Sequence, residues 1–162
     1  RRATLAQQAY AVENPRGFAG YSALDWGLTA SDGPGTQHPE AGGRSFSGYL
    51  AREAGRKDDG TIAPTAAAGS IAFAPEIVLP TLRHWRENRP ELWSPEGFAD
   101  AFNPTAGWVG PDRIGIDQGP IALMAENYRS GFVWDVMKRD PDLRRGLQRA
   151  GFTGGWLAQG AP

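Results

Sequence analysis

The chain has 162 residues, of which 40% are hydrophobic and 22% charged, with 17 basic residues against 18 acidic ones. This composition supports one folded domain or a piece of a larger one, and the net charge of -1 gives no electrostatic reason to expect nucleic acid or an anionic membrane as a partner. The absence of cysteine excludes disulfides, and no apolar run approaches the roughly 20 residues that a membrane-spanning helix needs.

The first half of the chain predicts helices separated by a long loop. A first helix is expected over residues 3–13, ending before Pro15 because the residue before a proline disfavours helix. A short helical piece is expected over 22–30, and the Gly- and Pro-rich residues 31–60 form a loop. The predicted inward face of the first helix comprises Leu5, Ala9 and Val12.

Two further helices follow this loop. The stretch 64–73 predicts a buried helix, since it is made of small and apolar residues and has a proline at its first position, where the missing N–H costs nothing. The stretch 75–87 predicts another, which Pro80 either kinks or begins. The apolar residues expected to face inward on this helix are Ile77, Val78, Leu82 and Trp85.

The second half repeats the alternation of loop and helix. Residues 88–119 form a second long loop in which short strands are possible, and a long helix is predicted over 120–138, with Gly131 inside it. A last helix is expected over 141–151, with Gly151 as its C-cap. The apolar stripe predicted on the long helix comprises Ile121, Met124, Ala125, Tyr128, Phe132 and Val136. The pattern predicts an all-α frame with two acid-bearing loops that each lead into a helix N-terminus.

Acidic and aromatic residues are mixed in the two long loops, a combination typical of carbohydrate sites. Carboxylates accept hydrogen bonds from sugar hydroxyls, indole rings pack against the C–H face of a pyranose, and glycosidic hydrolysis uses two carboxyl groups. Helix capping is the competing explanation for any single aspartate. The residues concerned are Asp58, Asp59, Asp100, Asp112 and Asp117, with Trp26, Trp93, Phe98, Phe102 and Trp108 nearby.

Other chemistries find less support in the sequence. His38 and His84 have no acid or cysteine at ligand spacing, so no metal site is expected, and His84 is interpreted as a surface or packing residue. The stretch "KDDGTIAPT" lacks the alternating oxygen ligands and the closing glutamate of a calcium loop. There is no phosphate-binding GxxxxGK[ST], no GxGxxG between a strand and a helix and no GxSxG. No cofactor is therefore expected.

Four stretches in order resemble the glycoamylase-like domain of bacterial β-1,2-glucanases and of the processing region of cyclic β-1,2-glucan synthases. They are "WGLTASDGPG" (26–35), "DDGTIAPTAAAGSIAFAPE" (58–76), "LWSPEGFADAFN" (92–103) and "IGIDQGPIALMAENYRSGFVWDVM" (114–137). The resemblance covers about residues 4–152 and implies a partial (α/α)-toroid of paired inner and outer helices. It further implies that residues 1–162 form the C-terminal part of that domain, with the N-terminal part missing.

The resemblance also implies a function and a site. The expected activity is that of a glycoside hydrolase on β-1,2-linked or related β-glucan, with Asp59 and Asp117 as cleft carboxylates. Transglycosylation during glucan cyclisation and non-catalytic glycan binding are the alternatives. The residues expected to contact or surround the substrate are Trp26, Asp32, Asp58, Asp100, Asn103, Trp108 and Gln118.

Expectations about partners and location follow from the same resemblance. If part of a toroid is missing, its helices expose apolar flanks, which the N-terminal half of the domain or a second chain is expected to cover. The other partner is the saccharide substrate, with neither nucleic acid nor membrane expected. The family implies a periplasmic or secreted location, although these residues contain no signal peptide.

Overall fold

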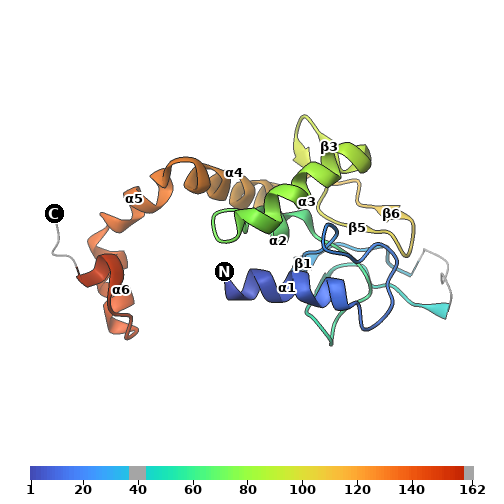
Figure 1. The fold of residues 1–162 in the computed structure, drawn as a ribbon, viewed down its shortest axis with the longest axis horizontal. Coiled ribbons are helices and arrows are strands. Elements are labelled where there is room, and N and C mark those ends of the chain that lie inside the picture. Colours follow the sequence, from blue (N-terminus) through green and yellow to red (C-terminus); the bar gives the residue numbers. More distant parts are fainter. Residues whose placement is uncertain (37–42, 159–162) are drawn as a thin grey trace. The chain divides into compact units, whose positions relative to one another are not determined.

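The structure, a computed structural model, describes residues 1–36 and 43–158. The chain divides into two compact units, residues 1–125 and residues 126–162. The described residues form six α-helices and three two-stranded antiparallel sheets (Figure 1). The all-α prediction is therefore only partly right, because short strand pairs hold the long segments between the helices.

The first helix, α1 (Arg2–Glu13), lies where the sequence predicts it. It ends at Asn14, which adopts the left-handed conformation (φ 44°) and donates its backbone N–H to the carbonyl of Tyr10. The predicted inward face is wrong in detail, because Val12 is 59% exposed and the buried positions are Thr4 and Ala11. These two residues are seven apart and therefore share a face of the helix.

No helix forms over residues 22–30. The hydroxyl of Ser22 accepts hydrogen bonds from the backbone N–H groups of Leu24 and Asp25, a local alternative to helical bonding. The chain then enters β1 (Ala30–Ser31), which pairs antiparallel with β2 (Leu50–Ala51) in the register Ala30↔Ala51 and Ser31↔Leu50.

The two central helices confirm the predicted positions, but the first of them is shorter than predicted. Helix α2 (Pro64–Ala68) stops at Gly69, and turns replace helix up to residue 73. Helix α3 (Pro75–Asn88) begins at Pro75 and contains Pro80 in its interior, so Pro80 is not its start. Its apolar face is as predicted: Val78 and Trp85 are buried, and Ile77 and Leu82 pack against the core.

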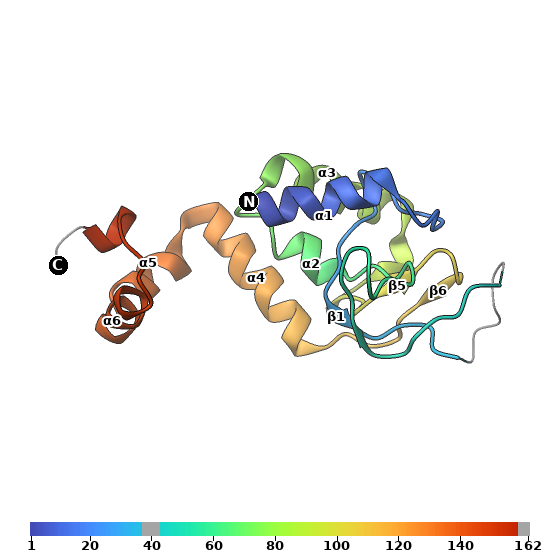
Figure 2. The same ribbon diagram turned by 90° about the horizontal axis from the view of Figure 1, so that it is seen from below.

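The second long loop contains two hairpins and a bridge to the first loop. After the 3-10 helix η2 (Pro90–Leu92), β3 (Trp93–Ser94) pairs with β4 (Gly97–Phe98), and β5 (Phe102–Asn103) pairs with β6 (Trp108–Val109). Phe102 also exchanges two backbone hydrogen bonds with Ile62. Figures 1 and 2 accordingly show β5, β6 and the loop after β1 at the same end of the first unit.

The core of the first unit joins both loops to helices α1, α2 and α3. The indole of Trp85 contacts the ring of Phe102 edge-on, with the ring centroids 5.9 Å apart. Since Phe102 belongs to the second loop and Trp85 to α3, this contact fixes the loop against the helix. The largest fully buried apolar side chains are Trp26, Trp85, Phe102, Ile62, Leu92 and Val78.

The long helix predicted over 120–138 is two helices in the structure. Helix α4 (Gly115–Ser130) begins before Pro120, and α5 (Phe132–Lys138) follows Gly131, whose positive φ of 73° ends the first helix. Helix α6 (Pro141–Arg149) is capped by the side chain of Asp140 and is followed by a 3-10 helix, η3 (Gly155–Ala158). Gly151 has a φ of 83°, as expected for the residue after a helix end.

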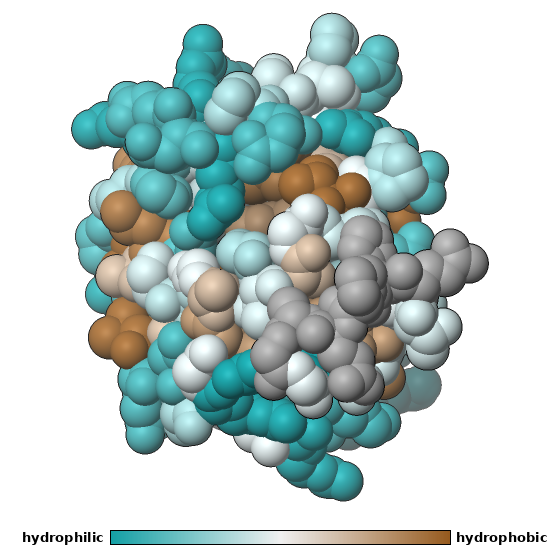
Figure 3. Space-filling view, turned by 90° about the vertical axis from the view of Figure 1, so that its right-hand side faces the viewer, coloured by the Kyte–Doolittle hydropathy of each residue, from teal (hydrophilic) through white to brown (hydrophobic). Residues whose placement is uncertain are grey.

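The apolar stripe of the predicted long helix is largely exposed. Tyr128, Phe132 and Val136 all have exposed side chains, so the stripe is not a buried face in this chain. This agrees with the expectation of apolar helix flanks. The face of the molecule drawn in Figure 3 differs from this stripe, because hydrophilic and intermediate residues predominate on it and hydrophobic residues form only small groups. Among the described residues, no helix has both the length and the hydropathy to cross a bilayer.

Candidate functional site

A cavity of about 410 Å³ lies within the first unit, beside the residues that follow β1 and the first turns of α2 and α4. Its lining residues come from three regions that are far apart in the sequence: 29–32 with 49, 65–66, and 100–120. Its lining is formed by Thr29, Ala30, Ser31, Asp32, Tyr49, Thr65, Ala66, Asp100, Ile114, Ile116, Asp117 and Pro120.

Three of the predicted site carboxylates line this cavity. Asp32 follows β1 directly, and its backbone N–H donates a hydrogen bond of 2.7 Å to Oδ2 of Asp100. Asp100 follows the β3–β4 hairpin, and its own N–H donates to the carbonyl of Asp112 at 3.0 Å. Asp117 lies in the first turn of α4, and its carbonyl accepts a 3.0 Å hydrogen bond from the Thr65 hydroxyl on α2. Backbone contacts therefore bring the three acids together.

Two oxygens of this group are buried without a donor. Asp100 is 2% exposed and Asp117 6% exposed, and neither Oδ1 of Asp100 nor Oδ2 of Asp117 has a hydrogen-bond partner among the described residues. A carboxylate oxygen only accepts, so two ionised carboxyls cannot satisfy each other. A proton on one of them supplies the missing donor, and the pair is therefore expected to hold a proton.

The electrostatics of the cavity agree with this geometry. Burial, a hydrogen bond with the Asp100 side chain and the charges of Asp100 and Asp32 raise the pKa of Asp117 to about 7. The N-terminus of α4 favours the ionised form of a carboxyl, but burial and the like charges outweigh it. Asp117 thus exchanges its proton near neutral pH, the property required of a group that donates or accepts a proton during catalysis.

Asp59, the other predicted cleft carboxylate, has very different surroundings. Its two carboxylate oxygens accept hydrogen bonds from Nε (2.9 Å) and Nη2 (3.1 Å) of Arg52, and one of them also accepts the Ser47 N–H at 2.9 Å. Burial favours the neutral form, but the hydrogen bonds and charge of Arg52 outweigh it, so that the pKa of Asp59 is lowered. Asp59 is not among the cavity-lining residues, and these contacts are those of a structural ion pair.

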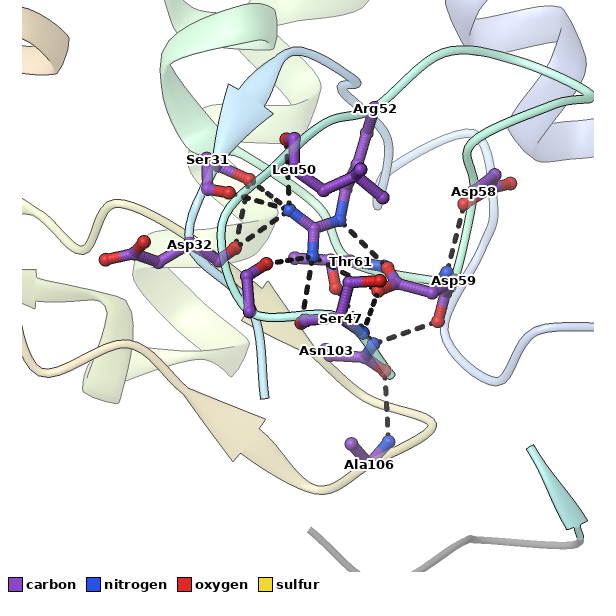
Figure 4. Close-up of polar contacts among 12 residues, drawn as sticks. Ser31, Asp32, Ser47, Leu50, Arg52, Asp58, Asp59, Thr61, Asn103 and Ala106 are labelled. Carbon is purple, nitrogen blue, oxygen red and sulfur yellow. Dashed lines mark hydrogen bonds and ion pairs between the residues drawn. The ribbon is translucent and has the colours of Figure 1, made fainter. Parts of the chain in front are cut away.

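The guanidinium of Arg52 joins three segments of the first loop (Figure 4). Besides Asp59, it donates to the backbone carbonyls of Ser31 (2.7 Å) and Asp32 (3.1 Å) and to that of Gly48 (3.0 Å). Figure 4 shows the Asp32 carboxylate pointing away from Arg52, while the Asp32 backbone carbonyl accepts from it. Arg52 therefore fixes the backbone beside the cavity without neutralising the Asp32 carboxylate.

Asp58 and Asn103 also serve the architecture of the loops. The Asp58 carboxylate accepts hydrogen bonds from the hydroxyls of Tyr10 (2.9 Å) and Tyr21 (2.7 Å). The fully buried amide of Asn103 donates from Nδ2 to the carbonyl of Asp59 and to the hydroxyl of Thr61, both at 3.0 Å. The predicted substrate contacts of Asp58 and Asn103 are therefore replaced by internal ones in this structure.

The remaining predicted residues lie outside the cavity lining. Trp26 is 1% exposed and donates its indole N–H to the hydroxyl of Thr81, which leaves no open face for a sugar ring. Trp108 borders a different hollow, near Arg89. Gln118 follows Asp117, but its amide exchanges two hydrogen bonds with the backbone of Phe98 and so ties α4 to β4.

Sequence reasoning missed Tyr49, Thr65 and Arg52. Tyr49 is an exposed aromatic residue on the cavity wall, and the stretch "FSGYLAR" carries no motif that marks it. The acids of "DDGTIAPT" indicate that a cation is needed nearby, but nothing in the sequence selects Arg52 among the 17 basic residues. Thr65 lies within the stretch "DDGTIAPTAAAGSIAFAPE", where the sequence predicts a helical position but gives no sign that the residue lines the cavity.

His84 takes part in a hydrogen-bonded cluster around Asp25. His84 lies 3.3 Å from Asp25, which also accepts hydrogen bonds from Trp85 and Arg89, so the prediction of a packing role for His84 is confirmed. His38, predicted to lie in a loop, is outside the described residues. Within residues 1–36 and 43–158, no group of three or more His, Cys, Asp or Glu side chains is arranged to hold a metal ion.

Comparisons with known proteins connect this geometry to a family. The exo-β-1,2-glucooligosaccharide sophorohydrolase (non-reducing end) of Parabacteroides distasonis is 38% identical over 145 residues, which are 88% of this chain and 18% of that protein. The crystal structure of an endo-β-1,2-glucanase from Chitinophaga pinensis, with sophorotriose and glucose, has a TM-score of 0.81 at 35% identity. That of a "putative glucoamylase" from Bacteroides uniformis has a TM-score of 0.80 at 44% identity.

The extent of these matches differs between this chain and its relatives. Each of the two structures covers 95% of this chain, while the chain spans 34% of their length and 18% of the curated relative. A model of the Glycoamylase family, described as "Putative glucoamylase", matches residues 1–141. Because that match covers most of the chain, including the residues that line the cavity, the chain belongs to the Glycoamylase family.

Proposed function

We propose that the protein is a glycoside hydrolase that acts on β-1,2-linked glucan and that Asp117 is its proton-carrying carboxyl. The observation that carries the proposal is the buried Asp100–Asp117 pair, in which each carboxyl has one oxygen without a donor and both residues line a cavity large enough for part of a saccharide. Relatives named as β-1,2-glucan hydrolases support the choice of linkage. The aromatic and hydroxyl side chains in the cavity wall are suited to a neutral, polar ligand.

The two carboxyls of the pair act as one acid group. Asp100 Oδ2 accepts the Asp32 N–H, and the proton of the pair is assigned to Asp117 because burial and the neighbouring carboxylates raise the pKa of Asp117. As the glycosidic C–O bond breaks, Asp117 protonates the departing oxygen, and water supplies the hydroxyl that ends on the anomeric carbon. Carboxyls that work on opposite sides of a glycosidic bond lie about 5–9.5 Å apart. Because Asp100 and Asp117 share one proton in this proposal, the second working carboxyl is a different one.

Asp32 is the described residue best placed for that second role. It is exposed, lines the same cavity and keeps its carboxylate clear of Arg52. Its charge contributes to the raised pKa of Asp117, as expected for a neighbouring ionised group. A carboxylate supplied by a segment beyond this chain would meet the same requirement, since the solved relatives are about three times as long.

The fold of the complete domain is proposed from the same relatives. The helices of this chain form part of an (α/α)-toroid, of which it is the C-terminal portion, and another part of the domain or a second chain covers the apolar flanks of α4 and α5. Support comes from the match to structures of which this chain spans 34% and from exposed Leu123, Phe132 and Met137. A periplasmic or secreted location is proposed from the resemblance to the glycoamylase-like family alone.

Product analysis of the complete protein with sophorooligosaccharides tests the reaction. Hydrolysis predicts that reducing ends accumulate in wild type and that Asp117→Asn abolishes the increase. Rings or longer chains without new reducing ends would indicate a transglycosylase instead. Binding without any product would reduce the protein to a glycan-binding module, and no binding at all would refute the proposed function.

A further inference from the structure

Tyr49 is exposed to an unusual degree for an aromatic residue that lines a cavity. The residue is 73% exposed, yet it borders the same cavity as Asp32, Asp100 and Asp117. No hydrogen bond of its hydroxyl is among the contacts of the described residues, and its ring is not needed for the core. An aromatic face open to solvent beside carboxylates is the arrangement that packs against a pyranose.

The register of the β1–β2 pair relates Tyr49 to Asp32. Ala30 is opposite Ala51 and Ser31 is opposite Leu50, so the next positions in the same register are Asp32 and Tyr49. Residues opposite each other in an antiparallel pair project from the same side. Both residues line the cavity, which agrees with this geometry. An aromatic face and a hydrogen-bond acceptor thus lie next to each other at the cavity wall.

The backbone that carries this pair is held firmly. Arg52 donates to the carbonyls of Ser47, Gly48 and Leu50 around Tyr49, and to those of Ser31 and Asp32 on the opposite segment. The side chain of Arg52 is completely buried and ion-paired with Asp59. Because the backbone is already fixed, only the two χ angles of Tyr49 have to be ordered when a ligand binds, which keeps the entropic cost of recognition low.

We propose that Tyr49 is a sugar-stacking residue and that, together with the Asp32 carboxylate, it forms a glucosyl-binding subsite at the edge of the cavity. The ring of Tyr49 packs against the C–H face of a glucosyl unit, and Asp32 accepts a hydrogen bond from a hydroxyl of that unit with one oxygen and leaves the other for the attacking water. The subsite binds a sugar adjacent to the bond that Asp117 protonates. This inference rests on the proposed function, whose substrate class it uses.

Binding of sophorotriose to the Asp117→Asn protein, measured by calorimetry, separates the two proposals because that variant does not turn the ligand over. Adding Tyr49→Ala or Tyr49→Leu is expected to weaken binding about 10-fold or more, equal to about 1.4 kcal/mol. Tyr49→Phe retains the ring and is expected to bind within about 3-fold of the parent, because the proposed contact is with the ring and not the hydroxyl. Asp32→Asn is expected to weaken binding through its loss of acceptor strength.

Tyr49→Phe is the matched control, since it changes the same exposed position and keeps the aromatic ring. Circular dichroism confirms that each variant is folded, and the exposure of Tyr49 makes folding independent of its ring. If Asp117→Asn binds sophorotriose and the Tyr49→Ala and Tyr49→Leu forms bind it equally well, the subsite is overturned while the proposed function stands. If Asp117→Asn binds no saccharide, the proposed function itself fails.

Discussion

Asp59 and Asp117 are both buried aspartates near the start of a helix, but their surroundings have opposite effects. Asp59 has an arginine, a backbone N–H from Ser47 and a lowered pKa. Asp117 has a second carboxyl, an oxygen without a donor and a pKa raised to about 7. The first arrangement fixes a charge in order to hold a loop, whereas the second leaves a proton available at the pH where an enzyme works.

Other carboxylates of the first unit resemble Asp59, because their oxygens accept hydrogen bonds from neighbouring side chains. Asp25 accepts hydrogen bonds from Trp85 and Arg89, and Asp58 accepts them from two tyrosine hydroxyls. Among the described residues, the only buried carboxylate oxygens without a partner are those of Asp100 and Asp117. Buried polar groups are normally satisfied, so an exception located in a cavity indicates a functional requirement. The four predictions below test this contrast.

The largest effect on folding is expected from Arg52→Ala. This change leaves the Asp59 carboxylate buried without its cation and removes the hydrogen bonds to the surrounding carbonyls, at a cost of about 3–5 kcal/mol in the free energy of unfolding. Urea denaturation at pH 7 measures the loss. A double variant, Arg52→Met with Asp59→Leu, is the control and is expected to recover part of it. A loss below about 1 kcal/mol would contradict a structural role for the pair.

The largest effect on catalysis is expected from Asp117→Asn. If Asp117 transfers the proton, kcat of the complete protein on sophorooligosaccharides falls by at least ~100-fold, the usual scale for such groups. Asp59→Asn is the matched comparison and is expected to lower thermal stability while retaining kcat per folded molecule. The contrast between the two aspartates fails if Asp59→Asn abolishes turnover or if Asp117→Asn leaves turnover near normal.

The pH dependence of stability gives a smaller and independent signal. The folded state binds the Asp117 proton more tightly than the unfolded state, because burial and Asp100 raise the pKa from 3.8 to about 7. Asp117 therefore lowers stability progressively as pH rises from about 4 to about 7, and Asp117→Asn removes this loss. Solvent in the cavity screens the charge, so the variant is expected to gain about 1–2 kcal/mol at pH 8.

The measurement is a set of thermal or urea transitions of both proteins between pH 4 and pH 8. The two curves are expected to converge at the acidic end and to separate toward the alkaline end. Parallel curves across the range would show that Asp117 has an ordinary pKa in the folded protein.

The smallest effect is expected from Tyr10→Phe. The change deletes one of the two tyrosine hydroxyls that donate to Asp58, and the carboxylate keeps the donors of Tyr21 and Gly60. The expected loss is about 0.5–1.5 kcal/mol in the free energy of unfolding, with kcat and its pH profile unchanged. A shifted pH profile of kcat would show that Asp58 takes part in catalysis. The distinction between structural carboxylates in the loops and catalytic carboxylates in the cavity would then fail.

The sequence allowed the helices and the acid-rich loops to be predicted, but not the partner of each acid. Residues such as Pro64 and Pro75 mark helix starts through local chemistry, so α2 and α3 were expected near their observed positions. The break at Gly131 was missed because an apolar stripe continues across it. In the 22–30 segment, the Ser22 hydroxyl competes with helical bonding, which periodicity does not show.

The site was predicted in part for a similar reason. Asp32, Asp100 and Asp117 were among the candidates, and all three line the cavity. Trp26 and Asn103 were candidates by residue type, yet the tertiary structure places both in its interior. Whether an aspartate is neutralised depends on contacts such as Arg52 with Asp59 or Asp32 with Asp100, the second of which joins residues 68 positions apart. Composition alone does not reveal such pairings.

The Arg52 side chain also has an evolutionary consequence. A Cβ atom on Gly33 would clash with Nη2 of Arg52 and with the backbone carbonyl of Ser47, so the guanidinium can occupy its position only while residue 33 is glycine. A lysine at position 52 has too few donors to replace the guanidinium fork. Positions 33, 52 and 59 are therefore expected to change together or not at all as the family diverges, and lineages that lose the ion pair should also remodel the segment bearing Tyr49.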